Sequence, residues 1–577
     1  MSTTADGPAG GEAAEWGVGW DDETLADETW ADETWADEAA AEEPIGTTPV
    51  GSRSLLAASA APAVGTALSR VTGLARVAAL TAALGLTTVA DVYNLANTAP
   101  NILYELVIGG VLSSTLVPVF IHANDSRARN AEDDSASVIV TVSFVAIALL
   151  AVVAVLLAPL INMAFSWSLD GTERARQQAI GDDFLILLLP QVFFYGMMTL
   201  GTALLHAKRR FAAPAFAPVL TNIVISAAAL SVYLFLDDDG PSPLRTVWVL
   251  GLGTTAGIAA MAVALLPAVR RSGTELRWSF KPRHPAISSV LRLSGWTVGF
   301  AVANQVSLLI VLTLARGVGV GAVSAYQYAF IFFQLPYGLI AVSLMTAVLP
   351  ELATAARDND DQRFAERFHE GLGLLLTFML PAAGAYLFIG RPLVEMLLQR
   401  GEFDAAATQT TSEMLTGFSL GLPAFAVFLY CVRAFHARRN TRTPFMLNVF
   451  ENVLNVVLVL PLVAMLSATG LSVAYSIAYW AAAAVALLVL NRHIPGLIQL
   501  GWLRPLGRSV LVTAAVLVWV GVAMRYVEPD SAIGQVVLCT TVGGIVFVAA
   551  TLLVRPPGFE PLVDRLASRR HRIRPGS

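Results

Sequence analysis

Long uninterrupted runs of apolar residues, such as 141–162 and 456–468, limit what this chain can fold into. A helix needs about 20 consecutive, mainly apolar residues to cross the hydrocarbon core of a bilayer. Hydrophobic residues make up 55% of the 577 residues and charged residues only 14%, whereas soluble chains carry roughly 25% charged residues. No soluble fold could bury so many apolar faces, so the sequence predicts a polytopic membrane protein.

Runs of this kind recur about fourteen times along the chain. They are continuous rather than alternating, which favours helices over the strands of a membrane barrel. The predicted spans are 57–86, 91–120, 136–165, 181–207, 213–236, 246–269, 286–315, 321–353, 366–390, 406–436, 444–466, 471–491, 509–526 and 532–554. The predicted fold is therefore an all-α integral membrane protein.

The loops test this count independently, because cytoplasmic loops carry an excess of Lys and Arg. With a cytoplasmic N-terminus, the inner segments hold 25 Lys and Arg and the outer segments hold seven. The inner groups are Arg127, Arg129, Lys208–Arg210, Arg270–Arg283, Arg357–Arg367, Arg438–Arg442, Arg492–Arg508 and Arg555–Arg574. We therefore expect a multi-pass protein of the plasma membrane with both termini in the cytoplasm.

The two ends of the chain differ in charge. Residues 1–50 contain the acidic repeat "LADETWADETWADEAAAEE", whose like charges and few aliphatic residues predict a disordered tail. The segment is not a secretory signal peptide, and Trp30 and Trp35 leave open a role as a docking peptide. The basic residues of 556–577 fit contact with anionic lipid head groups, at about 1 kcal/mol each, better than contact with nucleic acid.

An internal duplication decides the architecture. The segments "HAKRRFAAPAFAPVLTN" and "HARRNTRTPFMLNVFEN" match at a constant offset of 230 residues. The matching pairs are His206/His436, Ala207/Ala437, Lys208/Arg438, Arg209/Arg439, Pro214/Pro444 and Asn222/Asn452. The offset equals six spans, which predicts two parallel six-helix lobes over 51–283 and 284–500, followed by two further helices over 501–555. Parallel repeats of this type place a cavity between the lobes and suit alternating access.

Charged and amide side chains inside the spans are the candidate binding groups, because a charge in the membrane must face water or a partner. Arg70 and Arg76 lie in the first span, and Asn101 and Glu105 lie in the second at a depth similar to that of Arg76. The arginines suit a cationic cavity wall for an anionic head group, since guanidinium groups bind phosphate well. The alternative is a local ion pair between the two spans, or an Arg70 side chain that extends to the interface.

Further polar residues lie at the ends of spans or between them. Asp91 suits the N-cap of the second span or, alternatively, gating or ion coupling, roles that Glu105 and Arg316 could share. Spans seven and eight carry Gln305, Gln327 and Gln334, whose amides could join helices or bind a sugar. The amides and the acid of span eleven suit interhelical packing: Glu451, Asn452 and Asn455.

Motifs for catalysis are missing from the sequence. It contains no P-loop, no zinc motif and no nucleophile elbow. Cys431 and Cys539 both lie in apolar stretches and form no metal-ligand pattern. We therefore expect neither an enzyme nor a bound metal or cofactor.

One segment carries a family resemblance. Residues 69–118 read "SRVTGLARVAALTAALGLTTVADVYNLANTAPNILYELVIGGVLSSTLVP" and resemble the first two helices of the MurJ/MviN lipid II flippases, within the MOP transporter superfamily. The residues that match the family pattern are Ser69, Arg70, Gly73, Arg76, Asp91, Pro100, Asn101, Gly110 and Pro118. The segment "QLPYGLIAVSLMTAVLPEL" resembles the family's eighth helix, and the layout of six, six and two spans agrees.

The resemblance implies a function in cell-wall synthesis. The substrate would be lipid II, a peptidoglycan precursor linked to undecaprenyl pyrophosphate, moved from the inner to the outer leaflet with its pyrophosphate near Arg70 and Arg76. The chain departs from the family pattern at Tyr104 and Glu105, where many members have a basic pair, and at the apolar "YAFIFF" in the eighth helix. Alternatives are export of another lipid-linked glycan, export of small cations, and a scaffold for cell-wall synthesis proteins.

Overall fold

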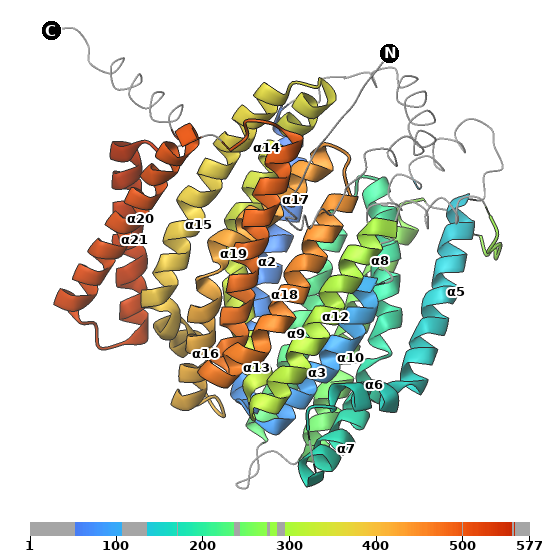
Figure 1. Cartoon of the computed structure of the whole chain (residues 1–577). Helices are drawn as coiled ribbons and strands as arrows, with labels where there is room; N and C mark the ends of the chain where they lie inside the picture. The colour runs from blue at the N-terminus through green and yellow to red at the C-terminus, as the bar shows by residue number, and fades with distance from the viewer. Residues whose placement is uncertain are drawn as a thin grey trace, which may run out of the picture. The chain divides into compact units, whose positions relative to one another are not determined.

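The computed structural model describes residues 52–106, 120, 135–169, 171–235, 243–273, 277–284, 295–498, 500–556 and 559. The chain divides into two units, Met1–Ala60 and Ala61–Ser577, and the described helical stretches that could cross a membrane all lie in the second unit (Figure 1). The predicted acidic tail, Gly110, Pro118 and most of the basic tail lie outside the described residues, so the expectations for them stay predictions.

The described residues form α-helices and one short π-helix, and they contain no strand. The helices of the first lobe are α2 (Ser52–Leu84), α3 (Thr88–Tyr104), α5 (Ser135–Leu156), α6 (Ala158–Phe165), α7 (Gly171–Leu188), α8 (Gln191–Ala207), α9 (Ala212–Leu234) and α10 (Pro243–Arg270). Those of the second lobe are α12 (Gly295–Val318), α13 (Ala322–Pro336), η3 (Tyr337–Ala341), α14 (Val342–Arg357), α15 (Asp361–Leu398), α16 (Ala405–Ser419), α17 (Leu422–Ala437), α18 (Arg442–Leu466) and α19 (Thr469–His493). Two further helices follow, α20 (Leu500–Val527) and α21 (Ala532–Val554).

Twelve of the described helical stretches are long and apolar enough to cross a membrane. The pair α16 and α17, bent by 47°, makes a thirteenth if it forms one span. The second predicted span, 91–120, is described only in part, through α3, so the count of fourteen stays a prediction. The all-helical membrane fold is confirmed.

Prolines set the breaks within these spans. Pro190 lies between α7 and α8, and Pro423 lies in the first turn of α17. Pro336 ends α13, and the next five residues form the π-helix η3 before α14 continues. Proline lacks the N–H that continues a helix, so a break or a wider turn follows at these positions.

The duplication appears in the backbone of two matching turns. Arg209, after α8, has a φ of 56°, and Arg439, after α17, has a φ of 58°. The amide of each donates to the carbonyl of the histidine three residues earlier, over 2.8 Å at His206 and 2.9 Å at His436. Two residues at an offset of 230 therefore share an uncommon left-handed conformation. We call the end with these turns the predicted inner end, and the opposite end the predicted outer end.

The two equivalent asparagines fasten equivalent helices. Asn222 on α9 donates to the Ser69 carbonyl and the Thr72 hydroxyl of α2, both over 3.0 Å. Asn452 on α18 donates to Asn304 Oδ1 of α12 over 3.0 Å. In each lobe an amide thus joins the fifth predicted span to the first, and the predicted packing role of Asn452 is confirmed.

The apolar segment "YAFIFF" has a packing role in the second lobe. Tyr326, Phe330 and Phe333 of α13 surround Phe418 of α16, with ring centroids 5.0, 5.5 and 5.4 Å away. Tyr475 of α19 lies 5.3 Å from the same ring. Aromatic packing of this kind adds about 0.5–1.5 kcal/mol per pair beyond area burial. These rings therefore form part of the core of the second lobe.

The last two helices pack beside α15 and against each other (Figure 1). The hydroxyl groups of Thr377 on α15 and Ser509 on α20 lie 2.7 Å apart, and the rings of Phe378 and Phe547 are 5.3 Å apart. The outward faces of α20 and α21 keep large apolar side chains exposed, as expected for surfaces solvated by lipid tails.

Candidate functional site

Asp91 joins the two lobes at the predicted outer end. Its side chain is 3% exposed, and its two carboxylate oxygens accept the backbone N–H groups of Gly321 and Ser324 over 2.7 and 2.9 Å. The hydroxyl of Ser324 donates to Asp91 Oδ1 as well, over 2.7 Å. Asp91 therefore caps the N-terminus of α13 in the opposite lobe. The cap of its own helix, α3, is Thr87.

The contact of Asp91 continues along the crossing of α3 and α13. Asn94 donates to the hydroxyl groups of Ser324 and Tyr328 over 2.9 and 3.2 Å. Gln327 donates to the Thr98 hydroxyl over 3.2 Å and to the Asn94 carbonyl over 3.4 Å. The amide of Gln327 thus joins helices, which is one of its two predicted roles. Asn94, Thr98, Ser324 and Tyr328 were not predicted.

The two helices at this crossing carry related sequences. Tyr, an amide residue and Ala occur in register in "DVYNLA" and "SAYQYA", which begin at Asp91 and Ser324. Asp91 and Ser324 are separated by 233 residues, as are Asn94 and Gln327, and each pair is hydrogen bonded. The duplicated helices therefore meet through matching positions, as at the axis of a two-fold assembly.

Arg316 makes a second connection between the lobes at the same end. It lies in the last turn of α12 and is 4% exposed. Its Nε donates to Gln177 Oε1 over 2.6 Å, and Nη1 donates to the Phe165 carbonyl and the Ser166 hydroxyl, both over 3.1 Å. Three hydrogen bonds from this buried guanidinium group fix α12 against the end of α6 and against α7, while Nη2 has no hydrogen-bond partner among the described residues.

Two further hydrogen bonds close the predicted outer end. The Ser168 hydroxyl of the first lobe donates to the Thr313 carbonyl of α12 over 2.7 Å. The backbone N–H of Glu402, in the turn between α15 and α16, donates to the Ala82 carbonyl near the end of α2 over 3.0 Å. The lobes are therefore held together here by hydrogen bonds from three separate segments.

Two guanidinium groups flank η3, which lies nearer the predicted inner end. Arg70 of α2 is exposed, and a Cβ atom placed on Gly338 would lie 3.7 Å from one of its guanidinium nitrogens. Arg433 of α17 is exposed as well and lines a pocket with the adjoining Tyr337. Among the described residues, no carboxylate pairs with either group. Arg433 was not predicted, although a charge within the span 406–436 was a signal for it.

Arg76 lies further along α2, half-buried. Its Nε is enclosed and makes no hydrogen bond within the described part of the chain. Asn101 instead donates to the Asn97 carbonyl over 2.9 Å. Glu105 is exposed and forms no ion pair with Arg76 in the described residues.

The remaining predicted glutamines differ from Gln327. Gln305 of α12 is half-buried and Gln334 of α13 is exposed. For neither does the described structure contain a side-chain hydrogen bond. The neighbouring Asn304 instead accepts from Asn448 over 2.9 Å, in addition to its bond from Asn452. The structure therefore does not bring all the predicted residues into one cluster.

Three pockets lie toward the predicted inner end. One of about 450 Å³ lies between α2, α8 and α9 of the first lobe. A smaller one of about 270 Å³ occupies the corresponding place in the second lobe, lined by Tyr337, Arg433 and His436 among others. The third, of about 540 Å³, lies where α14 and α17 end.

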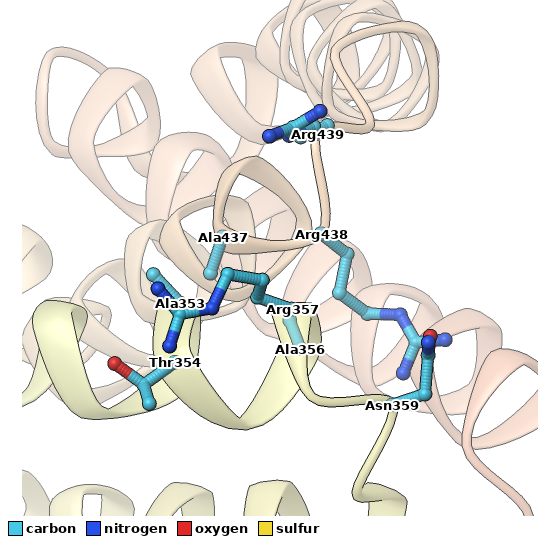
Figure 2. A pocket seen from close by; sticks show the side chains of 8 residues that line it. All are labelled: Ala353, Thr354, Ala356, Arg357, Asn359, Ala437, Arg438 and Arg439. Atoms are coloured by element: carbon cyan, nitrogen blue, oxygen red, sulfur yellow. The ribbon is translucent and has the colours of Figure 1, made fainter. Parts of the chain in front are cut away.

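Two of the three arginines that line the third pocket, all labelled in Figure 2, have carboxylate partners. Arg438 contacts Asp361 over 2.7 Å, and Arg357 contacts Asp358 over 3.3 Å. In Figure 2 the Arg438 side chain extends toward Asn359, on the turn after α14. Because two of the three charges of this pocket are compensated and all three lie at the ends of helices, the cations inside the spans that are best placed for an anionic ligand are Arg70 and Arg433. The described residues contain no cluster of three His, Cys, Asp or Glu side chains that could hold a metal.

Several known proteins are similar to this chain. The lipid II flippase MurJ of Burkholderia cenocepacia is 29% identical over 384 residues, covering 66% of this chain and 72% of that protein. A probable lipid II flippase MurJ of Rhizobium meliloti is 28% identical, covering 71% of this chain and 76% of that protein. One of Synechocystis sp. is 25% identical, covering 90% and 99%.

Solved structures share the fold. Lipid II flippase MurJ in an inward closed conformation matches with a TM-score of 0.70 and 21% identity, over 87% of this chain and 99% of that one. An inward-facing multidrug resistance transporter of the MATE family, in the MOP superfamily, matches with a TM-score of 0.62 and 15% identity, over 74% and 95%. The model of the family "Lipid II flippase MurJ" matches residues 80–539. The chain therefore belongs to the lipid II flippase MurJ family.

Proposed function

We propose that this chain moves lipid II from the inner to the outer leaflet of the plasma membrane by alternating access, with both termini in the cytoplasm. One observation carries the proposal: in the described part of the chain, the lobes are joined by buried polar contacts at one end, while cations without a carboxylate partner and three pockets lie toward the other. A transporter open to one side needs this asymmetry, because one gate must be closed while the other admits substrate.

The polar contacts of the closed end suit a gate. Asp91 and Arg316 both make hydrogen bonds to the opposite lobe. Breaking such bonds exposes both partners to water, so each net loss is only about 0.5–1.5 kcal/mol for a neutral pair and more for a charged one. A gate of this kind is stable and still able to open. We therefore assign Asp91 and Arg316 to gating.

The guanidinium groups suit recognition of a pyrophosphate. Arg70 and Arg433 approach η3 from different lobes, and Arg76 has an enclosed Nε without a hydrogen-bond partner among the described residues. Guanidinium groups bind phosphate oxygens with two parallel hydrogen bonds. A ligand held by cations of both lobes favours their approach at the inner side. We propose Arg70, Arg76 and Arg433 as the substrate cations, with Asn101, Glu105, Gln305 and Gln334 near the path of the ligand.

The test is the accessibility of lipid II at the outer surface of cells depleted of this protein. An externally added enzyme that cleaves lipid II reports the fraction in the outer leaflet. We expect cleavage to fall on depletion and to recover when the wild-type chain, but not an Arg70→Ala variant, is restored. Unchanged cleavage in a strain without a second flippase would exclude lipid II as the substrate and favour another lipid-linked glycan.

A matched deletion separates transport from scaffolding of cell-wall synthesis proteins. Removing residues 1–50 leaves every proposed gating and binding residue in place. A flippase lacking this segment should retain most of the externally cleavable lipid II. Loss of cell growth with normal cleavage would instead point to a scaffold that acts through the acidic tail.

A further inference from the structure

The pockets of the two lobes have diverged at equivalent positions. Helices α8 and α17 end at Ala207 and Ala437, at the offset of 230 residues that relates the lobes. Thr199 and Thr202 of the first pocket correspond to residues 429 and 432 of the second, which are Leu and Val. Ala203 corresponds to Arg433. One lobe therefore presents hydroxyl groups where the other presents apolar groups and a cation.

The hydroxyl groups of the first pocket keep much of their hydrogen-bonding capacity. A helical threonine usually donates to the carbonyl four residues earlier, as Thr72 and Thr313 do over 2.8 and 2.7 Å. Thr199 instead lies 3.5 Å from the Tyr104 hydroxyl, and Thr202 lies 3.6 Å from the Met198 sulfur. The contact of Thr199 is longer than the 2.7–2.8 Å or so of a good O–H···O bond, and the thioether sulfur that Thr202 contacts is only a weak acceptor.

The rest of the pocket lining supplies aromatic faces and three further polar side chains. Phe211 is 45% exposed, and its ring centroid lies 5.1 Å from that of His206. Thr66, Tyr104 and His206 add further polar atoms to the wall. Hydroxyl groups beside an exposed aromatic face suit a pyranose ring, because such a ring has polar edges and an apolar C–H face. A volume of about 450 Å³ lies within the range of about 300–1,000 Å³ typical of ligand pockets.

The pocket lies close to one of the proposed substrate cations. Thr66, which lines the pocket, and Arg70 lie four residues apart on α2, so their side chains project from the same face of the helix, one turn apart. A ligand with a sugar in the pocket would thus keep its phosphate groups on the side of Arg70. This order, sugar next to phosphate, is the order of groups in a lipid-linked saccharide.

We infer that the pocket of the first lobe, lined by Thr66, Tyr104, Thr199, Thr202, His206 and Phe211, binds the sugar of the lipid-linked substrate. The inference rests on the proposed function and assigns parts of the ligand to parts of the protein. The hydroxyl-lined lobe holds the sugar, and the cations beside η3 and on α2 hold the pyrophosphate. The two duplicated lobes then bind two chemically different parts of one head group.

The test compares two lipids that differ in the sugar. Full-length protein in lipid nanodiscs is titrated with lipid II and with undecaprenyl pyrophosphate, which carries no sugar. In the Thr199→Val, Thr202→Val double variant, we expect affinity for lipid II to fall about tenfold, from the loss of two hydrogen bonds, and affinity for undecaprenyl pyrophosphate to stay unchanged. The matched control is Thr540→Val on the lipid-facing α21, which should change neither affinity.

The possible outcomes have different meanings. Selective loss of lipid II affinity supports the sugar pocket. Equal loss for both lipids, or no loss for either in a double variant whose thermal unfolding matches that of the wild type, overturns it while the proposed function stands. If the wild-type chain binds lipid II no better than it binds a neutral prenol, the proposed function itself fails, and the sugar pocket fails with it.

Discussion

Arg433 is a cation without a carboxylate partner among the described residues, on a helix that is otherwise mostly buried. Exposed cations in a membrane span are expensive unless they face a water-filled cavity or a ligand. The equivalent residue of the first lobe, Ala203, is 3% exposed and uncharged. The asymmetry places one extra positive charge on the second lobe, next to η3.

We expect Arg433→Gln to lower the externally cleavable lipid II at least about tenfold, because a charged hydrogen bond to phosphate contributes about 1.5–3 kcal/mol. Arg433→Lys should retain part of the activity, since it keeps the charge and loses the planar fork. The control is Arg525→Gln, whose side chain is 82% exposed in an ion pair with Glu528. Full activity of Arg433→Gln at normal membrane levels would remove Arg433 from the binding site.

Arg316 supports a prediction about stability. Replacing it with Leu would leave Gln177 Oε1, the Phe165 carbonyl and the Ser166 hydroxyl without their donor. Buried acceptors that lose a charged donor destabilise a fold by about 1–3 kcal/mol or more. We expect the thermal unfolding temperature of the purified protein to fall by several degrees. Arg400→Leu, which removes an exposed arginine whose side chain donates to carbonyls at the end of α15, should cause little change.

At the scale of elements, α13 depends on the opposite lobe for its N-terminal cap. Asp91→Ala removes the acceptor for the amides of Gly321 and Ser324, a loss of about 1 kcal/mol or more. We expect faster hydrogen exchange at the first turn of α13 and unchanged exchange at α16. The matched variant Asp404→Ala removes the cap of α16, which accepts from Ala407 over 2.8 Å, and should give the reverse pattern.

Exchange that stays slow at α13 in Asp91→Ala would show that the cap is dispensable and that other contacts close the outer end. In that case the gating role proposed for Asp91 would be wrong. Faster exchange at both α13 and α16 in Asp91→Ala would indicate that the whole fold is loosened. The Asp404→Ala variant would then show the same change.

The sequence predicts the helices well and their polar contacts poorly. Apolar runs and prolines locate nearly all spans, because both are local properties of the chain. The match between His206 and His436 locates the lobes, because the duplication preserves a turn. The cap formed by Asp91 escapes prediction, since its partners lie 230 and 233 residues away and helical periodicity carries no information about them. An aspartate in the first turn of a helix suggests a cap for that helix, and here Thr87 serves instead.

The residues of the candidate site likewise divide into those whose role the sequence can predict and those whose role it cannot. Arg70 and Arg76 could be found from sequence, because a charge in an apolar span stands out. Sequence alone could not show whether a glutamine joins helices or faces a ligand, because that depends on the neighbouring helix. Gln327 bonds α3, whereas Gln334, two turns later on the same helix, is exposed.

At the scale of the whole molecule, transport requires the closed end to open. Ser168 and Gly317 belong to different lobes, and a Cβ atom on Gly317 would lie 3.3 Å from that of Ser168. A disulfide between Ser168→Cys and Gly317→Cys is therefore within reach of normal geometry. We expect oxidation to stop the appearance of lipid II in the outer leaflet and a reducing agent to restore it.

A second cysteine pair controls for effects of oxidation and cross-linking that do not depend on motion between the lobes. Gly417 and Ser472 both belong to the second lobe, and the corresponding Cβ distance is 3.1 Å. Cross-linking Gly417→Cys to Ser472→Cys should leave transport largely unaffected, because it ties helices that move together. The native Cys431 and Cys539 are both buried and should not interfere. Continued transport with the lobes cross-linked at Ser168 and Gly317 would contradict alternating access by motion of one lobe against the other.

The contact between Asp91 and Ser324 also bears on how such a chain could arise. Near a two-fold axis, each residue of a symmetric dimer faces its own copy. If two identical lobes were separate subunits, this position would hold the same residue in both. Two aspartates would repel each other in the buried site. Two serines would leave no carboxylate to accept the amide N–H groups of the facing helix. Once the two copies are joined in one gene, each can mutate independently of the other. The interface that closes this protein is thus one that an ancestral homodimer could not have built.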